Sequence, residues 1–457
     1  MTRRRVAVTG LGVVSSLGCG LDLFWRRCLE GATVVKPIPE RWRRYWEPKS
    51  RVWSPLGDWR RSTPLLTRIE RRRMDPAAQI AVQAAAEALG GAEIELEPMD
   101  DKRNTYRIPT FSPERTAVFM GTGIGGLHST LSTAACHMLT PARQRLRELG
   151  ARRAEEDPEL VRELERVLEG LPAPKVFNPF AVTMSMPNAV AANLAVKLGF
   201  RGPARTLAGA CASGTIAVGK AFRAIRDGEC DAALTGGTEF LSDDYGSCFR
   251  GFDAVGALVD GDLPPEAVNR PFDEDRSGFL FAEGGAAVLI LEELRGARER
   301  GAPVLAEVTG YGETCDGHDL MAMEPSGAQV RRAVEACLAD AGLAAADVGY
   351  VNAHGTGTES NDPLECGVIE EIFDPGVAVG STKSLLGHTL GASGALEAVV
   401  TVSALREEIV PPTRGLERPI ADLRFVTRAD SLSMDHALSQ SFAFGGHNAV
   451  VAFGRPR

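Results

Sequence analysis

One cysteine of this chain has neighbours that suit a nucleophile. Cys211 lies in the segment TLAGACASG (206–214), between an apolar segment and a helical pattern that covers 215–226. We therefore expect Cys211 at a turn from a strand into a helix, where the helix N-terminus stabilises a thiolate and lowers the pKa of the thiol. The small neighbours let a substrate approach, and the following backbone N–H groups can stabilise an oxyanion. A buried core cysteine at a Gly/Ala-rich helix start explains this segment equally well.

Two of the seven histidines lie in loops rich in small and hydroxylated residues. His354 ends the run YVNAH and precedes Gly-Thr-Gly-Thr, whereas His388 ends GSTKSLLGH and is soon followed by GASG at 391–394. A residue on a loop at the end of a strand is well placed for chemistry in an α/β protein. A hydrogen-bonded core position is the usual explanation for a single histidine. Two histidines in such loops, together with Cys211 in a third loop of small residues, favour a shared site.

Cysteine and histidine are also the residues that most often bind zinc. Cys211, His354 and His388 could in principle bind zinc, but no two ligands are spaced by three or four residues, and the small polar surroundings favour a substrate tunnel. We therefore expect no metal. The remaining cysteines form no CxxC pair, and we expect them to be small buried hydrophobic residues. They are Cys19, Cys28, Cys136, Cys230, Cys248, Cys315, Cys337 and Cys366.

The composition excludes several classes of protein. The chain has 457 residues, 44% of them hydrophobic, a formal net charge of −9 and nine cysteines, an odd number. These values are not those of a disordered chain, a secreted disulfide scaffold or a general nucleic-acid binder. No apolar stretch approaches the ~18 residues of a transmembrane helix. The N-terminal run is a poor signal peptide, and we expect instead a strand at 5–9, a turn at 10–12 and a cytoplasmic protein.

Short motifs recur in the same order in two parts of the chain. The matching pairs are VTGLG (8–12) with VTGYG (308–312), GTG (121–123) with GTG (355–357), ASG (212–214) with ASG (392–394), and FAEGG (281–285) with FAFGG (442–446). Four pairs in register predict two related α/β halves that form one duplicated body. We place the halves at residues 1–296, with the cysteine nucleophile, and 297–457, with both histidines.

The first half is longer than the second by about 120 residues, which we expect in loops or caps outside the repeated core. Residues 33–73 hold four of the five tryptophans among several arginines. Residues 138–172 are charged, with Leu and Val at helical spacing, and predict one or two amphipathic helices broken near Gly150 or Pro158. Extra packing or a subunit contact is the expected role of both insertions.

The chain resembles the β-ketoacyl-[acyl carrier protein] synthases, the thiolase-fold condensing enzymes of the elongating KAS II type. The similar segments follow one another along the whole chain. They are VAVTGLGVVSSLG at the start, GTGIGG (121–126), RGPARTLAGACASG (201–214), RPFDEDRSGFLFAEGGAAVLILEE (270–293), VNAHGTGTESND (351–362), GSTKSLLGHTLGASGALE (380–397), VPPT (410–413) and SFAFGGHN (441–448). The resemblance implies an α/β, thiolase-like fold whose duplicated halves form a five-layered αβαβα body with cap insertions.

The resemblance also implies a reaction and a role for each matching residue. Cys211 would carry the acyl chain as a thioester, and His354 and His388 would assist decarboxylation of malonyl-carrier and donate hydrogen bonds to the enolate. Lys383, held by Glu397, would orient the histidine loops. The further implied roles are Phe444, Gly445 and Gly446 as a gate with an oxyanion hole at the N–H groups of Cys211 and Phe444, Asp362 and Glu365 behind the histidines, Thr356 and Thr358 on phosphopantetheine, Ile124 in the acyl pocket, and Arg72 and Arg73 on the acidic carrier.

The implied partners are an acyl carrier protein, which brings the substrates on phosphopantetheine, and a second subunit. No other cofactor, no nucleic acid and no membrane is expected. The gate loop departs from the family, which usually has Gly where this chain has Ala443 and Thr where it has His447, and Gly256 replaces a family arginine. These departures affect the expected substrate and the expected partner, and leave the expected reaction unchanged.

Three alternatives stay open at this point. The chain could be the ketosynthase subunit of a type II polyketide or polyene synthase, paired with a chain-length partner that lacks the cysteine. It could be a thiolase-like scaffold with a dead site, which the intact Cys–His–His–Lys set disfavours. A true thiolase is disfavoured as well, because such enzymes have a second cysteine where this chain has Phe444.

Overall fold

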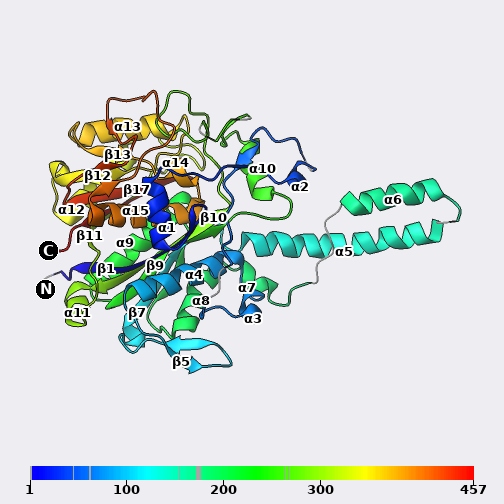
Figure 1. The fold of residues 1–457 in the computed structure, drawn as a ribbon, viewed down its shortest axis with the longest axis horizontal. Coiled ribbons are helices and arrows are strands. Elements are labelled where there is room, and N and C mark those ends of the chain that lie inside the picture. The colour runs from blue at the N-terminus through cyan, green and yellow to red at the C-terminus, as the bar shows by residue number, and fades with distance from the viewer. Residues whose placement is uncertain are drawn as a thin grey trace.

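A long mixed sheet runs through the molecule, and both halves of the chain supply its strands (Figure 1). The computed structural model describes residues 3–44, 46–60, 63–153, 155–170, 177–261, 263–265 and 267–457. The strands of this sheet are β1 (Val6–Ser15), β2 (Gly18–Cys19), β7 (Thr116–Gly121), β8 (Ala204–Leu207), β9 (Ala232–Phe240), β10 (Gly284–Glu293), β11 (Ala306–Cys315), β12 (Val348–Asn352), β13 (Ala378–Gly380), β15 (Arg424–Phe425), β17 (His436–Ala443) and β18 (His447–Gly454).

The order of the strands is the same in the two halves. The first half runs β1-β10-β9-β7-β8, and the second runs β11-β18-β17-β12-β13, with β15 beyond it. The halves meet where β1 pairs antiparallel with β11, Val6 opposite Val308. The duplication that the repeated motifs predicted is therefore present in the strand order. In the described residues, three two-stranded sheets lie outside this sheet: β3 (Lys36–Pro37) with β4 (Val52–Trp53), β5 (Glu97–Asp100) with β6 (Thr105–Arg107), and β14 (Ile409–Val410) with β16 (Asp430–Ser431).

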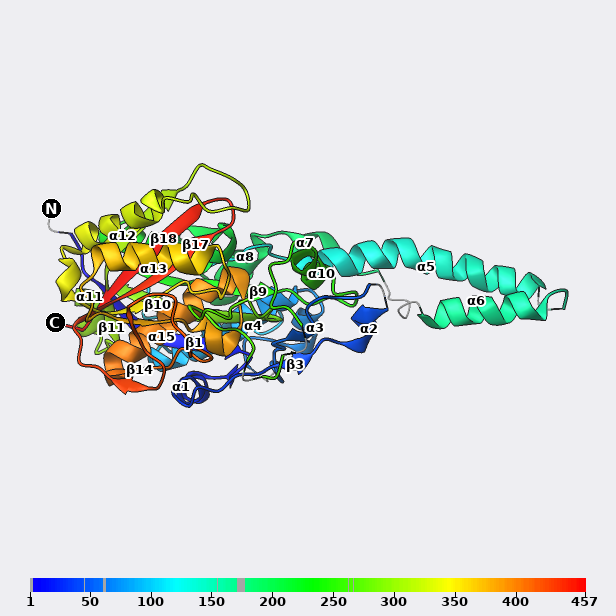
Figure 2. The ribbon, with the colours of Figure 1, turned by 90° about the horizontal axis from the view of Figure 1, so that it is seen from above.

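Helices cover the strands in three layers, so the body has the five layers that the resemblance implied (Figures 1 and 2). Helices α9 (Ser213–Arg226) and α15 (Ser393–Glu407) pack on each other and against strands of both halves, and form the central layer. On one outer side α4 (Pro76–Gly91) and α8 (Ala189–Leu198) cover the first half, and on the other α12 (Ala328–Ala341) and α13 (Asn361–Ile372) lie over the second. Thirteen residues of α15 are buried, and eleven of them are alanine, valine, leucine, serine or threonine.

The remaining helices are shorter or lie at the edges of the body. They are α1 (Leu21–Leu29), α2 (Glu40–Arg43), α3 (Arg68–Arg71), α7 (Ala181–Ser185), α10 (Ser247–Ala254), α11 (Leu294–Glu299), α14 (Lys383–Leu386) and the 3₁₀ turns η1 (Pro113–Arg115), η2 (Ala210–Ala212), η3 (Ala345–Asp347) and η4 (Leu390–Ala392). In the described residues, no helix is both long and apolar enough to span a bilayer.

The expected turn at 10–12 is wrong, because these residues lie inside β1. The glycines serve helix packing instead. A Cβ on Gly12 would lie 2.0 Å from the carbonyl oxygen of Ala84 in α4, and one on Gly312 would lie 2.0 Å from that of Ala333 in α12. In both halves the missing side chain thus lets a helix approach the strand closely.

The tryptophan-rich insertion packs onto the body. Trp42, Trp53 and Trp59 are buried, and the rings of Trp42 and Trp53 are 4.9 Å apart. Trp42 and Trp53 belong to the same apolar cluster as Cys211 and Phe281, so the insertion extends the core beside the expected nucleophile. Residues 45, 61 and 62 of this insertion lie outside the described residues.

The second insertion forms two helices, as the spacing of its apolar residues predicted. Helix α5 (Leu127–Arg153) passes through Gly150 without a break, and α6 (Pro158–Gly170) returns beside it. Of the two expected break points, only the one at Pro158 is correct. The pair projects far beyond the rest of the molecule (Figures 1 and 2). Residues 154, 171 and 172 of this insertion are not described.

Candidate active site

The expected site residues come together where strands of both halves end in loops and helix starts. Cys211 lies in η2 directly before α9, and the equivalent turn of the second half, η4, precedes α15. The residue before Cys211, Ala210, has φ 45°, and Leu390 at the equivalent position has φ 47°. This conformation is unfavourable for a residue with a side chain. Its presence in both turns shows that the surrounding packing holds them in one shape.

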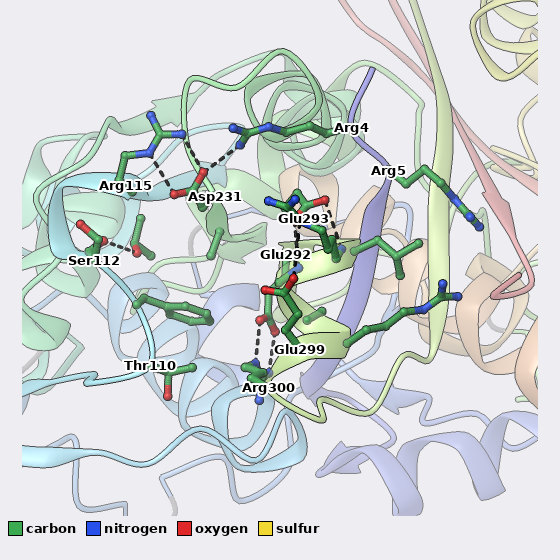
Figure 3. Close-up of a pocket in the computed structure, with 18 of the residues that line it drawn as sticks. Arg4, Arg5, Thr110, Ser112, Arg115, Asp231, Glu292, Glu293, Glu299 and Arg300 are labelled. Atoms are coloured by element: carbon green, nitrogen blue, oxygen red, sulfur yellow. Dashed lines mark hydrogen bonds and ion pairs between the residues drawn. The ribbon is translucent and has the colours of Figure 1, made fainter. Parts of the chain in front are cut away.

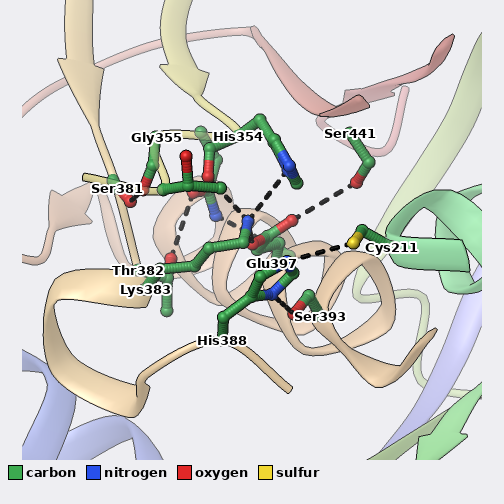
Figure 4. Close-up of polar contacts among 12 residues, drawn as sticks. Cys211, His354, Gly355, Ser381, Thr382, Lys383, His388, Ser393, Glu397 and Ser441 are labelled. Carbon is green, nitrogen blue, oxygen red and sulfur yellow. Dashed lines mark hydrogen bonds and ion pairs between the residues drawn. The ribbon is translucent and has the colours of Figure 1, made fainter. Parts of the chain in front are cut away.

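Cys211, His354 and His388 surround one small volume (Figure 4). The Sγ atom of Cys211 is 3.1 Å from Nε2 of His388. The two imidazole rings lie 5.7 Å apart at an angle of 82°. Nδ1 of His388 is 3.0 Å from Oγ of Ser393, which also accepts a hydrogen bond from the backbone N–H of Thr389. The ring of His388 is therefore held at both nitrogens.

Lys383, the first residue of α14, is buried and donates to three acceptors (Figure 4). Its ammonium group contacts the carboxylate of Glu397, the carbonyl oxygen of His354 at 2.7 Å and Nδ1 of His354 at 3.1 Å. An ammonium group has three N–H donors and no acceptor. Nδ1 of a neutral His354 must therefore accept, which leaves its hydrogen on Nε2.

Both imidazoles are neutral at physiological pH. Burial lowers the pKa of His354 well below its ordinary value. The positive charge of Lys383, and the charge that His388 would carry if protonated, lower this pKa further. Burial, followed by the charge of Lys383, does the same to the pKa of His388. A neutral imidazole with hydrogen on Nε2 donates one hydrogen bond and carries no charge of its own. His354 is thus suited to bind an oxygen on which negative charge develops.

The thiol of Cys211 does not have the lowered pKa that its place before a helix led us to expect. Burial raises its pKa to about 12, and the positive charge of Lys383 offsets only part of this effect. Loss of hydration thus outweighs the favourable helix N-terminus in this closed site. Cys211 is a thiol at rest, and its proton must leave when the sulfur reacts.

Two buried carboxylates fix the loop that carries His354. Glu365 accepts hydrogen bonds from the backbone N–H groups of His354 and Gly355, both at 2.7 Å. Asp362 accepts from the N–H of Thr356 at 3.1 Å and from that of Phe272 at 2.7 Å. Burial raises the pKa of Glu365 to about 7 and also raises that of Asp362. Both residues thus lie behind the histidine loop, where the resemblance led us to expect them.

The expected gate is the tight connection between β17 and β18. Gly445 and Gly446 have φ 83° and 73°, so both positions need glycine. The N–H of Gly445 donates to the carbonyl oxygen of Leu320 at 2.7 Å. The ring of Phe444 stacks at 17° to that of Phe252 with centroids 6.4 Å apart. These contacts tie the gate to the loop of Leu320 and to helix α10.

A cavity of about 580 Å³ opens onto this site. Cys211, His354 and His388 line its inner end, and Thr356, Thr358 and Phe444 line it as well. Ile124 does not line this cavity: its side chain is 41% exposed and its N–H donates to Glu239. Its place in the acyl pocket stays a prediction.

The two arginines expected to dock a carrier are exposed on the surface near α7. Arg72 caps α3, and its carbonyl oxygen accepts a hydrogen bond from the side chain of Asn178 at 2.9 Å. The guanidinium of Arg73 lies 4.7 Å from the ring centre of Phe180. Neither residue lines the cavity. Both side chains are exposed at the surface.

Sequence reasoning missed Glu239 and the contact of Ser393. The buried carboxylate of Glu239 accepts hydrogen bonds from backbone N–H groups of the 123–125 loop and from Gly391 at 3.2 Å, and so joins the two halves behind Cys211. Burial raises its pKa to about 7. A single carboxylate inside an otherwise uncharged strand, AALTGGTEF, was the available signal.

A larger hollow of about 950 Å³ lies near the N-terminus, away from these residues (Figure 3). Several of its charged groups pair with one another. Arg4 and Arg115 both bind Asp231, and Arg300 binds Glu292. It contains neither a nucleophile nor an unpaired base, and we do not assign the chemistry to it. The described residues also include no group of three or more metal-ligating side chains in position to hold an ion.

The layered, duplicated fold together with the Cys–His–His site defines a condensing enzyme of the thiolase-like class. The chain matches the family models "Beta-ketoacyl synthase, N-terminal domain" over residues 3–296 and "Beta-ketoacyl synthase, C-terminal domain" over residues 305–417. It belongs to the β-ketoacyl synthase family.

Relatives and solved structures agree with this family. The chain is 35% identical to 3-oxoacyl-[acyl-carrier-protein] synthase 2 of Synechocystis sp., over 99% of this chain and 98% of the relative. It is 34% identical to the same enzyme of Rhizobium meliloti, over 99% of both. Its structure is similar to a β-ketoacyl synthase from Burkholderia phymatum (TM-score 0.79, 29% identity, 99% and 100% covered). It is also similar to the ishigamide ketosynthase/chain length factor (TM-score 0.79, 28% identity, both chains fully covered).

The raised pKa of Cys211 predicts how its alkylation depends on pH. We expect the rate of reaction with iodoacetamide to rise about tenfold per pH unit from about pH 7 to pH 9 without levelling, because the reactive thiolate fraction grows in this way below the pKa. Peptide mass spectrometry measures the rate at each cysteine, with the exposed Cys315 as an internal reference. A rate that levels off below about pH 8 would contradict the raised pKa and favour stabilisation by the helix N-terminus.

Proposed function

We propose that the chain catalyses decarboxylative Claisen condensation of an acyl thioester on Cys211 with malonyl-acyl carrier protein, in chain elongation of the fatty-acid type. The observation that carries this proposal is the arrangement of one thiol and two neutral imidazoles at the inner end of a single cavity. A thiol can carry an acyl group, and neutral imidazoles can stabilise an enolate without adding charge.

In the first step the sulfur of Cys211 attacks the thioester carbonyl of the acyl-carrier. The new C–S bond to Cys211 forms as the bond to the phosphopantetheine sulfur breaks. The proton of the Cys211 thiol ends on the released phosphopantetheine thiol, so the exchange is balanced. With the hydroxyl of Ser393 donating to Nδ1 of His388, the Nε2–H of His388, 3.1 Å from Sγ, would stabilise the sulfur as its proton leaves. Backbone N–H groups of Cys211 and Phe444 would bind the transient oxyanion.

In the second step malonyl-carrier enters and loses CO₂. The electrons of the broken C–C bond form an enolate, whose oxygen would receive hydrogen bonds from His354 and His388. The enolate carbon attacks the acyl-Cys211 carbonyl, the thiolate of Cys211 leaves, and one proton from solvent restores the thiol. The product is a 3-oxoacyl chain on the carrier. Lys383 would serve as a positioning residue, because it fixes the tautomer of His354 through Nδ1.

The remaining roles are assigned from the positions of the residues in and around the cavity. Thr356 and Thr358 would contact the phosphopantetheine arm, since they line the path between the surface and Cys211. Phe444, on its two-glycine loop, would gate the entry of the acyl chain toward Ile124. Asp362, Glu365 and Glu397 would support the histidines through the backbone and through Lys383.

The two steps can be separated by mutation. We expect Cys211→Ala to lower condensation by at least about a thousandfold, because no acyl-enzyme can form, while decarboxylation of malonyl-carrier continues. His354→Ala should lower decarboxylation itself by about 10²–10³-fold, because one donor to the enolate is lost. Mass spectrometry of carrier-bound products measures both rates. Cys136→Ala is the control for removal of a thiol elsewhere, and a Cys211→Ala enzyme that still condenses would disprove the mechanism.

We further propose that Arg72 and Arg73 dock the acidic acyl carrier protein. Both are exposed, and a type II polyketide ketosynthase with similar structure (TM-score 0.80, 25% identity, both chains fully covered) was solved in complex with its acyl-carrier protein. Opposite charges at the rim of such a contact act mainly on encounter and affinity.

This docking predicts a change in KM that depends on the carrier. Arg72→Glu with Arg73→Glu should raise KM for carrier-bound substrates about tenfold and leave kcat on small pantetheine thioesters unchanged. The matched control reverses Arg332 and Arg428, two exposed arginines elsewhere. Unchanged kinetics with the carrier would exclude these residues from docking.

We keep the proposed division into halves at residues 1–296 and 297–457, which is supported by the repeated strand order on either side of α11. A cytoplasmic location is proposed on chemical grounds. All nine cysteines are free, and the reaction needs Cys211 reduced.

A second candidate is the ketosynthase subunit of a type II polyketide or polyene synthase. It is favoured by the structural likeness to the ishigamide ketosynthase/chain length factor. The two candidates differ in the subunit that pairs with this chain. A homodimer is supported by the edge strand β8 and by exposed apolar side chains nearby, such as Val182 and Val196.

The oligomeric state of the chain expressed alone separates these candidates. We expect a homodimer that condenses acyl and malonyl groups without another subunit, because the site is complete within one chain. Size-exclusion chromatography with light scattering gives the mass, and product analysis of the same fraction gives the activity. An inactive or aggregated chain that becomes active only with a chain-length partner would favour the polyketide assembly.

A further inference from the structure

The helical arm that projects from the body has no assigned task. We define the arm as α5 from Met138 to Arg153 together with α6. Figures 1 and 2 show that α5 and α6 lie side by side and extend beyond all other elements. α6 packs on α5, and none of the residues of α6 is buried. Two helices that shield each other on only one side leave much apolar surface in water.

The contact between the two helices uses one face of each. On α5 the half-buried Leu146 and Gly150 and the buried Arg143 face α6, and the guanidinium of Arg143 donates to the carbonyl oxygen of Leu168 at 2.8 Å. A Cβ on Gly150 would lie 3.8 Å from the side chain of Leu164. On α6 this contact uses Leu164 and Leu168, whereas Val167 of the same helix stays exposed.

A second face of the arm is exposed and carries both apolar side chains and arginines. On α5, the exposed Met138, Ala142, Arg145, Leu149 and Arg152 are spaced alternately by four and three, as on the contact face of a coiled coil. Met138 is 70% exposed and Leu149 42%, and on α6 Val167 is 45% exposed. The spacing matches what a further helix pair would need to pack against the arm.

The charges of the arm are separated between its two helices. Residues 143–153 contain five arginines and one glutamate, whereas residues 155–170 contain seven acidic residues and two arginines. Three of these arginines and three of these glutamates are exposed and have no ion-pair partner within the described part of the chain. They are Arg145, Arg147 and Arg152 on α5, and Glu159, Glu165 and Glu169 on α6.

We propose that the arms of two copies of this chain pair into a four-helix bundle, with α5 of each copy beside α6 of the other. A two-fold contact of this kind places each basic helix against an acidic one and covers the exposed side chains of Met138, Leu149 and Val167. The separation of charge favours a second copy over an acidic carrier protein as the occupant. A carrier attracted to α5 would also be repelled by the adjacent α6.

Charge reversal tests this pairing with a built-in control. The first variant carries Arg145→Glu, Arg147→Glu and Arg152→Glu, and the second carries Glu159→Lys, Glu165→Lys and Glu169→Lys. A third variant carries all six substitutions. The first two variants each have an arm of mainly one charge, whereas the third is again self-complementary and carries the largest number of changes. It therefore controls for damage to the fold.

We expect the first and second variants to associate at least about tenfold more weakly than the natural chain, and the third to associate like the natural chain, in a dilution series followed by analytical ultracentrifugation at low salt. Circular dichroism checks the helix content of each. Four equal dissociation constants, or a third variant as weak as the first two, would overturn the proposal.

Co-expression provides the second measurement. If arms pair between copies, the first and second variants should form mixed assemblies in excess of a random distribution, because each supplies the charge that the other lacks. Native mass spectrometry counts the assemblies, and it detects pairing both within a dimer and between two dimers. A random distribution would overturn the proposal.

The arm test does not depend on the catalytic proposal. Turnover of small pantetheine thioesters should be the same in all four chains, since the arm lies away from Cys211. If reversal on α5 raised only KM for carrier-bound substrates and left association unchanged, the arm would be a carrier surface and the pairing would be disproved. If all four chains associated as expected but none condensed, the proposed function alone would be wrong.

Discussion

The buried ammonium group of Lys383 is the constraint on which the site depends. It is buried, and each of its three N–H donors meets an acceptor on Glu397 or His354. A buried charge without its partner costs several kcal/mol, so the loop of His354 and the helix that carries Glu397 must stay together. The same contact sets the tautomer of His354. Catalytic geometry and local stability therefore rest on one group.

Burial governs the protonation of almost every ionisable group around Cys211. It keeps the thiol protonated, lowers the pKa of both histidines and raises that of Glu239 and Glu365. The cause is the same throughout, since a charged form loses hydration that the protein only partly replaces. The result is a site with little net charge at rest. Negative charge that develops on a substrate then meets oriented donors, and the carboxylate of Glu397 is paired with Lys383.

The duplication explains how one chain assembles this site from distant segments. Each half provides the same turn before a central helix, with a strained residue at Ala210 or Leu390. In the first half this turn presents Cys211, whereas in the second it follows His388 and brings Gly391 to the carboxylate of Glu239. Similar backbone thus serves two tasks. The arm interrupts only the first half, at a place where a long insertion leaves the layers undisturbed.

The sequence alone determined the family and the duplication, and it predicted Cys211, His354, His388 and Lys383 as site residues, because these inferences depend on residue types at fixed positions along the chain. It also predicted the two helices of the arm from their apolar spacing. It predicted a turn at 10–12, where the structure has a continuous strand. Glycine is needed there because helix α4, some 75 residues further along the chain, packs closely on this strand. It also missed Glu239. Only the tertiary structure decided the protonation of the site, because pKa values depend on burial, and burial depends on contacts between segments far apart in sequence.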